Sequence, residues 1–287
     1  MMGNNMDLNY EMFCYQCEQT ANGKGCTKLG VCGKTPEIAN LQDLLIFQVK
    51  GISCYGKVLM ENGAHMDKTV VSFIENVLFT TLTNVNFDVD AHLELLRESQ
   101  RIKEQVREMA GRSSNPTAHA AYDLPESKSD MLRDAPLAGI MYDNTLDPDI
   151  RSLKSLILFG IRGMAAYAYH AAVLGYEDET VNAFFYKALS FLGFDLEMGD
   201  LLPVVLEVGE VNLKCMELLD RANTETFGNP EPTKVSLTVE KGPFIIITGH
   251  DLYDLKLLLE QTKDKGINVY THGEMLPAHA YPLLKQY

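Results

Sequence analysis

The sequence of 287 residues predicts a mainly α-helical protein: two duplicated three-helix bundles followed by the first βαβ part of a Rossmann-like α/β domain. Two observations predict this fold. Helical leucine spacing recurs in the same order in two stretches of the chain, and after residue 229 short apolar runs replace it. A third observation concerns function, because four of the six cysteines fall within nineteen residues near the N-terminus.

These patterns divide the chain into five predicted segments. They are an N-terminal segment with a cysteine loop (1–33), a first three-helix bundle (34–111), a linker (112–149), a second three-helix bundle (150–228) and the truncated start of an α/β domain (229–287). Ser, Pro, Asp and Ala dominate the linker, as expected for a connection without a core of its own.

The bundle prediction depends on an internal repeat. Residues 41–55 align without gaps on residues 153–167, and their identical positions follow helical spacing. Any two amphipathic helices share leucine spacing, but two further helical patterns recur in the same order, which favours duplication. The identical pairs are Leu41/Leu153, Leu44/Leu156, Phe47/Phe159, Gly51/Gly163 and Tyr55/Tyr167, and Lys50/Arg162 is a conservative pair.

In the last segment the pattern of apolar residues changes from helical spacing to short strand-like runs. Residues 234–239 alternate as in a strand, residues 244–247 form a continuous apolar run, residues 251–263 have helical spacing, and residues 267–270 form another strand. This order is the opening of a parallel sheet. Two parallel strands do not make a stable sheet alone, so we expect the unit either to pair with something outside this chain or to be part of a larger domain.

Composition limits the partners of the chain. It carries 25 Lys plus Arg against 39 Asp plus Glu, a net charge of −14, which disfavours nucleic acid and anionic membrane surfaces. The most apolar stretch, residues 155–175, contains Arg162 and His170, which favours a core helix over a membrane span. The N-terminus lacks a secretory signal, so we expect a cytoplasmic protein with reduced cysteines.

The cysteine cluster has the spacing C-x2-C-x8-C-x5-C at Cys14, Cys17, Cys26 and Cys32. Four thiolates on one glycine-rich loop can hold the four irons of a [4Fe–4S] cluster. Structural zinc is the alternative, but four-cysteine zinc sites use two short knuckles and the second spacing here is too long. Disulfides would need an oxidising compartment. Cys54 and Cys215 lie in helical apolar patterns, where buried structural thiols are expected.

Two further candidate ligands follow the predicted strands. His250 and Glu274 both stand just past the carboxyl ends of neighbouring parallel strands, where open α/β sheets place ligands. Together they make a plausible half of a metal site. The alternative is structural, because Asp251 could simply cap the helix that begins there.

Several motifs together resemble the hybrid cluster protein family, also called the prismane or hydroxylamine reductase family. They are Met12–Thr20 (MFCYQCEQT), the cysteine spacing, Ala39–Leu45 (ANLQDLL), Gly228–Glu231 (GNPE), Thr248–Leu252 (TGHDL) and Tyr270–Pro277 (YTHGEMLP). The resemblance runs from Met12 to Tyr287 and covers only the N-terminal half of the family's usual length. It implies an N-terminal domain of paired three-helix bundles followed by α/β domains.

The resemblance also implies cofactors and an activity. Cys14, Cys17, Cys26 and Cys32 match the ligands of a [4Fe–4S] cubane that relays electrons. His250 and Glu274 match two of the eight ligands of a hybrid [4Fe–2S–2O] cluster, at which hydroxylamine or nitric oxide is reduced. The other ligands belong to the family's second half, so we expect these 287 residues alone to be inactive.

The expected partners are a small-molecule substrate and a redox protein that delivers electrons, without nucleic acid or membrane. The alternatives are a single-cluster electron-transfer module and a zinc-stabilised helical module.

Overall fold

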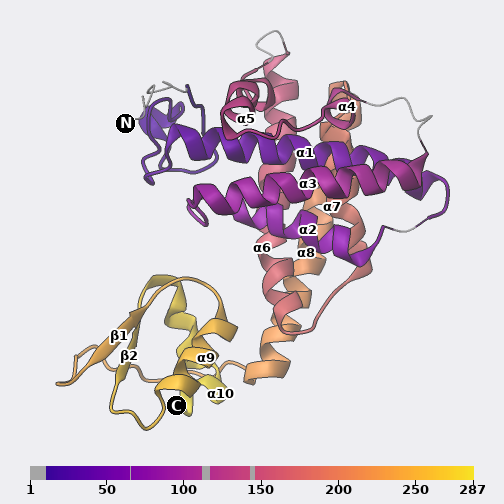
Figure 1. The fold of residues 1–287 in the computed structure, drawn as a ribbon. Helices are drawn as coiled ribbons and strands as arrows, with labels where there is room; N and C mark the ends of the chain where they lie inside the picture. The colour runs from indigo at the N-terminus through magenta and orange to yellow at the C-terminus, as the bar shows by residue number, and fades with distance from the viewer. Residues whose placement is uncertain (1–10, 65, 112–116, 143–145) are drawn as a thin grey trace. The chain divides into compact units, whose positions relative to one another are not determined.

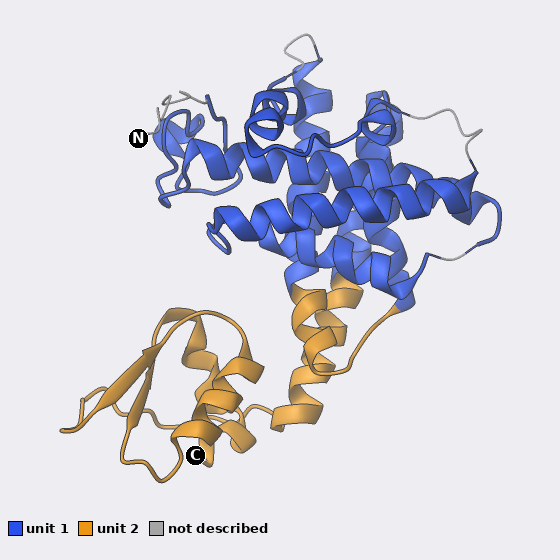
Figure 2. Ribbon diagram, viewed as in Figure 1, with its two compact units in different colours: residues 1–166, 179–212 blue, residues 167–178, 213–287 orange. Residues whose placement is uncertain are grey.

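A computed structural model of the chain describes residues 11–64, 66–111, 117–142 and 146–287 (Figure 1). The protein is mainly helical with one small two-stranded parallel sheet in the described residues, which confirms the predicted fold class at that level. It divides into two compact units, residues 1–166 with 179–212 and residues 167–178 with 213–287 (Figure 2). These units cut across the five segments predicted from the sequence, which stay a prediction, as does the paired-bundle arrangement.

Unit 1 is built from helices. Its elements are η1 (Ala21–Gly23), α1 (Pro36–Glu61), α2 (Lys68–Thr80), α3 (Val89–Ala110), α4 (Ala118–Ala121), α5 (Lys128–Asp134), η2 (Ala135–Ala138) and α7 (Glu179–Leu192). Two long helices, α6 (Pro148–Val173) and α8 (Met198–Phe227), begin in unit 1 and end in unit 2.

Helix α1 forms the centre of unit 1 and packs against α3, α7 and α4 (Figure 1). The helix starts at Pro36, and the Thr35 hydroxyl accepts a hydrogen bond from the Ile38 N–H at 3.3 Å. Proline at the first turn and a threonine cap are typical of a helix start. The predicted leucine stripe is buried, since Leu41 and Leu45 are 0% exposed.

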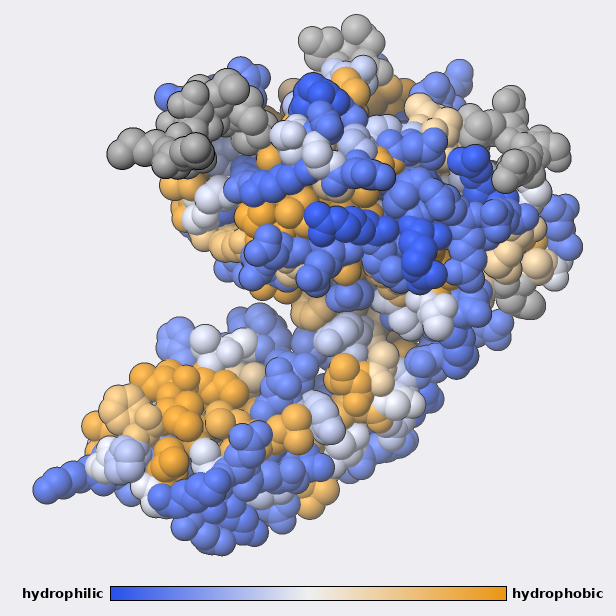
Figure 3. Space-filling model, in the orientation of Figure 1, coloured by the Kyte–Doolittle hydropathy of each residue, from blue (hydrophilic) through white to orange (hydrophobic). Residues whose placement is uncertain are grey.

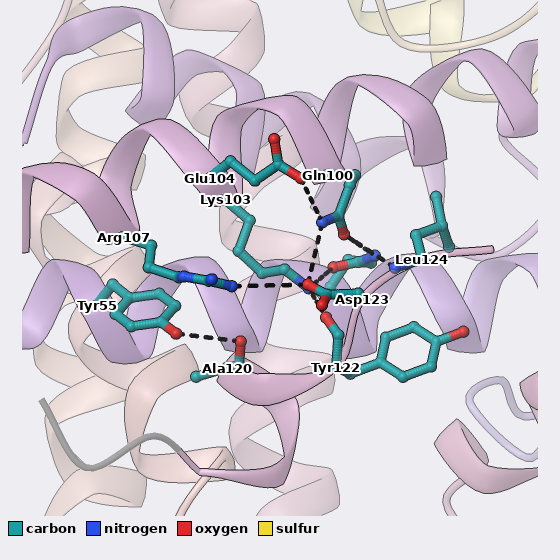
Figure 4. A network of polar contacts seen from close by, with 10 residues as sticks. Tyr55, Gln100, Lys103, Glu104, Arg107, Ala120, Tyr122, Asp123 and Leu124 are labelled. Carbon is teal, nitrogen blue, oxygen red and sulfur yellow. Dashed lines mark hydrogen bonds and ion pairs between the residues drawn. The ribbon is translucent and has the colours of Figure 1, made fainter. Parts of the chain in front are cut away.

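Residues 117–138 fold onto α1 and α3 around the buried Lys103 (Figure 4). Lys103 is 1% exposed, and its ammonium donates to Gln48 Oε1 at 2.6 Å and to the Tyr122 carbonyl. The Tyr55 hydroxyl donates to the Ala120 carbonyl at 3.3 Å, and the Leu124 N–H donates to Gln100. Part of the segment predicted as a linker is therefore anchored to the core by buried polar contacts.

Helix α6 is the one helix, among the described residues, that is long and apolar enough to cross a membrane. Within unit 1, its residues Ile157, Ile161 and Ala165 are 0% exposed, and Arg162 is 4% exposed. A helix with one fully packed face and a buried arginine is typical of the core of a globular protein.

Unit 2 contains the predicted βαβ order. Strand β1 (Phe244–Ile247) pairs in parallel with β2 (Asn268–Thr271), joined by α9 (Leu252–Thr262) and followed by η3 (Gly273–Ala280) and α10 (Pro282–Lys285). A small core holds these elements together, made of Phe227, Leu255, Met275, Ala278 and Leu284. The sheet keeps an uncovered apolar face, because Phe244 and Ile246 are 60% and 63% exposed (Figure 3).

The strand predicted at residues 234–239 is wrong. This segment has no regular secondary structure, and Leu237 and Val239 are 98% and 82% exposed. Alternating hydrophobicity specifies a strand only when a sheet edge and a core lie beside it. Neither is supplied to these residues by the part of the chain that the structure describes.

Candidate metal centre

The cysteine loop folds back on itself so that its first and third cysteines pair. Cys14 and Cys26 form an antiparallel bridge, with the Cys14 N–H to Cys26 carbonyl distance 3.1 Å and the reverse pair 2.8 Å. The turn between them is η1, where Asn22 and Gly23 both have positive φ, 56° and 64°. Left-handed backbone of this kind favours asparagine and glycine, which explains the residues found there.

The second half of the loop is shaped around Cys32. The Gly30 N–H donates to the Lys34 carbonyl at 2.8 Å, and Gly33 has a φ of 91°. A Cβ on Gly30 would lie 3.1 Å from Cys32 Sγ and 3.0 Å from Lys34 Cβ, so a side chain there would press on both. The predicted role of glycine in bringing the backbone close to the thiols is therefore visible at this position.

None of the six cysteines is joined in a disulfide bond in the described residues. Cys26 is buried, whereas Cys14, Cys17 and Cys32 are half-buried. Cys54 and Cys215 are 5% and 0% exposed, which confirms their prediction as buried thiols. The four loop cysteines thus lie close together in the chain, and three of them keep some access to solvent.

Two buried cations lie beside the loop thiols. Lys34 is 3% exposed, and burial lowers its pKa while the Cys14 thiol opposes that effect. Arg162 is 4% exposed, and burial lowers its pKa to about 10 while Asp43 and Cys14 act in the opposite direction. Positive charge held near thiols stabilises the thiolate, which is the form that binds metal.

A glutamine connects one of these cations to a thiol. The Arg162 Nη1 donates to Gln16 Oε1 at 3.2 Å, and the Gln16 Nε2 lies 3.8 Å from Cys14 Sγ. Gln16 also donates to the Thr81 carbonyl at 3.4 Å, which fixes the amide between the loop and the bundle.

Sequence reasoning missed Gln16, Lys34 and Arg162 as parts of the site. Gln16 and Lys34 carry no sequence signal beyond their closeness to Cys14 and Cys32. Arg162 does carry a sequence signal, because the repeat alignment pairs it with Lys50 on an otherwise apolar helical stripe. A basic residue kept at equivalent positions of two buried helices is the pattern that could have identified it.

His250 and Glu274 lie where the sequence places them, three residues past the ends of β1 and β2, and both are exposed. The two strand ends are joined there, since the His272 N–H donates to the Ile247 carbonyl at 2.9 Å. The structural alternative is also present, because Asp251 caps α9 by accepting from the Tyr253 and Asp254 N–H groups at 2.8 and 3.0 Å. Because Asp251 caps the helix, the His250 side chain is not needed for the cap and can serve as a metal ligand.

Among the described residues, no three or more His, Cys, Asp or Glu side chains are grouped so that they could hold one metal ion. The structure therefore does not by itself assign a metal to the cysteine loop or to His250 and Glu274. The predicted ligand sets stay predictions at this point.

Comparison with known proteins gives a family. Residues 12–287 match the model of the Prismane/CO dehydrogenase family. Proteins named hydroxylamine reductase are similar over 96% of this chain: 47% identical in Syntrophobacter fumaroxidans, 46% in Thermoanaerobacter pseudethanolicus and 46% in Methanocella arvoryzae. The chain covers 52%, 51% and 52% of these relatives, about half of their length. The resemblance drawn from the sequence motifs is confirmed.

Proposed function

The chain belongs to the Prismane/CO dehydrogenase family, and on this premise we propose that it is the iron–sulfur, electron-relaying part of an oxidoreductase that reduces hydroxylamine. The observation that carries the proposal is the loop of four free cysteines with Lys34 and Arg162 buried beside it. The name hydroxylamine reductase belongs to the relatives, which are about twice as long as this chain.

The loop fits a [4Fe–4S] cluster better than a single zinc ion. Structural zinc needs four ligand atoms at about 2.3 Å from one point, so its sulfurs converge tightly. Four-cysteine zinc sites usually reach this convergence with two short knuckles, and here only the pair Cys14 and Cys17 has knuckle spacing. In a [4Fe–4S] cubane each of the four irons binds its own thiolate, so the four thiolate sulfurs surround a whole cluster and not one metal atom. The two buried cations also suit a cluster that carries net negative charge with its thiolates.

A bound [4Fe–4S] cluster would supply one-electron transfer, with Cys14, Cys17, Cys26 and Cys32 as its ligands. The residues of the chain set the conditions for it. Lys34 and Arg162 offset the charge of the thiolates, and Gln16 directs its amide at Cys14. Gly30 allows the backbone to approach Cys32 closely.

Reduction of hydroxylamine takes two electrons and two protons, breaks the N–O bond and releases ammonia and water. We propose that His250 and Glu274 contribute two ligands to the hybrid [4Fe–2S–2O] cluster at which this occurs, and nitric oxide is a second candidate substrate. Six of the eight ligands implied by the family resemblance lie outside these residues. We therefore expect little turnover from the 287 residues alone and electron delivery by a separate redox protein in the cytoplasm.

Metal analysis after anaerobic purification tests the cofactor. We expect about four iron and four sulfide per chain. Serine at each of the four loop cysteines should reduce the iron content, while Cys54→Ala, the matched change at a buried thiol, should leave it unchanged. One zinc per chain without iron would overturn the cluster and support the zinc-stabilised module.

Activity assays test the rest of the proposal. A single-cluster electron-transfer module is the second candidate, because His250 and Glu274 are exposed and lack further ligands among the described residues. Hydroxylamine turnover should be absent for the 287 residues and present for a chain of the relatives' length. Full turnover by the short chain would contradict our view of the catalytic site.

A further inference from the structure

A cavity of about 690 Å³ in unit 1 is lined by α1 and α6, the two helices related by the internal repeat. The repeat shapes its walls: five lining positions of α1 have their repeat equivalents lining it from α6. Three of these pairs carry the chemistry, namely Phe47/Phe159, Asp43/Ser155 and Lys50/Arg162. Cys14 and Gln16 also line the cavity, so it adjoins the cysteine loop. Duplication has thus produced two similar walls facing one space.

The cavity has an excess of positive charge. Five basic side chains line it, against three carboxylates. The charges of Lys154 and Arg162 act on Lys50 there: burial and these two charges together lower the pKa of Lys50 to about 8. Asp43 is the acidic group that acts on Lys50 and Arg162, and burial raises its pKa to about 6. Asp43 is therefore shared by Lys50 and Arg162.

Arg162 also keeps an unused donor. The residue is 4% exposed, and its Nη1 is bonded to Gln16. Its Nε has no hydrogen-bond partner in the part of the chain that the structure describes. Burying an ionised donor without an acceptor is costly, so an anion that accepts from this group gains more there than it would at the surface.

The remaining walls are aromatic and apolar. The Phe159 ring lies edge-on to Tyr15 with centroids 5.6 Å apart, and the Arg162 guanidinium is 5.9 Å from the Phe159 centroid. On the opposite wall, the Phe47 ring lies 4.2 Å from the His119 ring. Small-molecule sites have this composition, mostly apolar with a few convergent polar groups, at volumes of about 300–1,000 Å³.

We propose that this cavity binds a small organic anion, with its carboxylate between Lys50 and Arg162 and its apolar body between Phe47 and Phe159. The volume exceeds what an inorganic anion needs, and the aromatic walls favour an apolar body. The proposal goes beyond the electron-relay function and does not depend on which metal the cysteine loop holds.

Isothermal titration calorimetry on the 287-residue chain tests the proposal with two probes of the same shape. Benzoate carries the charge and benzamide does not. We expect benzoate to bind at least about tenfold more tightly than benzamide, the effect of one charge-assisted hydrogen bond. Absence of benzoate binding, or equal binding of the two probes, overturns the proposal.

Variants of α1 locate the site. Lys50→Met should weaken benzoate binding about tenfold or more, whereas Lys50→Arg, which keeps the charge, should restore most of it. Lys57→Met is the matched control, because Lys57 lies on the same helix with its Nζ 4.8 Å from the Phe194 ring centroid, outside the cavity. A folded Lys50→Met protein that binds benzoate as the wild type does, or equal losses in Lys50→Met and Lys57→Met, would show that the cavity is not the site.

Discussion

The guanidinium of Arg162 donates a hydrogen bond to the Gln16 side chain at 3.2 Å, which joins the middle of α6 to the cysteine loop. The two residues are far apart in the sequence, and both are needed to connect a buried charge with the Cys14 thiol 3.8 Å from Gln16 Nε2. The same arginine faces the cavity between the repeated helices. Arg162 therefore links the candidate redox site with the candidate ligand site.

Replacing Arg162 by glutamine should make the bound cluster harder to reduce. The reduced cluster carries one more negative charge, which the nearby buried cation stabilises. We expect the midpoint potential to fall by about 60 mV, a tenfold change in the equilibrium constant of a one-electron couple. Redox titration followed by electron paramagnetic resonance measures it.

The control for this change is Lys28→Gln, which removes an exposed charge from the same loop. Its potential should shift far less, because solvent and salt screen exposed charges. Equal shifts in the two variants would show that burial of Arg162 does not matter. Failure to bind iron in the wild type would instead contradict the cofactor assignment.

Gly30→Ala should lower the iron content of the chain. The added methyl group would meet Cys32 Sγ at 3.1 Å and Lys34 Cβ at 3.0 Å, so the loop must shift near a candidate ligand. Gly199→Ala is the control, because a Cβ there has open space around it. We expect iron per chain to fall by at least about half for Gly30→Ala, since loss of ligand-supporting residues costs metal affinity about 10–100-fold. Unchanged iron would show that the loop tolerates the shift.

Much of the helical framework could be predicted from the sequence. The leucine stripe of α1, with Leu41 and Leu45 fully buried, is a local periodic signal that needs no knowledge of the partner helix. The strand order around α9 was also predictable, because Ile245 to Ile247 is a continuous apolar run. These signals depend on neighbours in the chain.

The parts that could not be predicted depend on packing between distant segments. The strand expected at residues 234–239 fails because alternation says nothing about whether a sheet edge is available. Lys34 looks like an ordinary charged residue until the fold buries it beside the thiols, and the repeat pairing of Arg162 with Lys50 does not indicate that Arg162 lies near Cys14. The spacing alone was enough to predict the four cysteines as metal ligands, but it did not predict that buried cations lie beside them.

Asp251→Asn should remove the acid sensitivity of α9 while keeping its cap. Burial acts to raise the pKa of Asp251, but the hydrogen bond with His170 and those from the Asp254 and Tyr253 N–H groups lower it overall. A lowered carboxyl pKa stabilises the fold above the unfolded-state pKa, and this stability is lost as pH falls through the folded-state pKa.

Hydrogen exchange of the α9 amides at pH 7 and at about pH 2.5, below the ordinary carboxyl pKa of 3.8, measures this effect. Protection should decrease toward the lower pH in the wild type and change less in Asp251→Asn. Asp251→Ala removes the cap and should lose about 1 kcal/mol of helix stability at pH 7. The same acid response in the wild type and in Asp251→Asn would show that another group is responsible.

Lys103→Met should destabilise unit 1, and its deficit should grow with pH. The variant leaves the Gln48 Oε1 and the Tyr122 carbonyl without their donor, at a cost of about 2–4 kcal/mol (Figure 4).

The pH dependence follows from the lysine pKa. Burial lowers the pKa of Lys103 to about 8, although the Asp123 carboxylate acts to raise it. The unfolded chain therefore binds more protons than the folded one between about pH 8 and the ordinary lysine pKa, so wild-type stability rises with pH through that window. Urea unfolding at pH 7 and pH 9 should show this widening gap, and Arg97→Met, an exposed change on the same helix, should show none. A gap that stays constant from pH 7 to pH 9 would mean that Lys103 keeps its proton in the folded protein over that range, so that burial does not lower its pKa as expected.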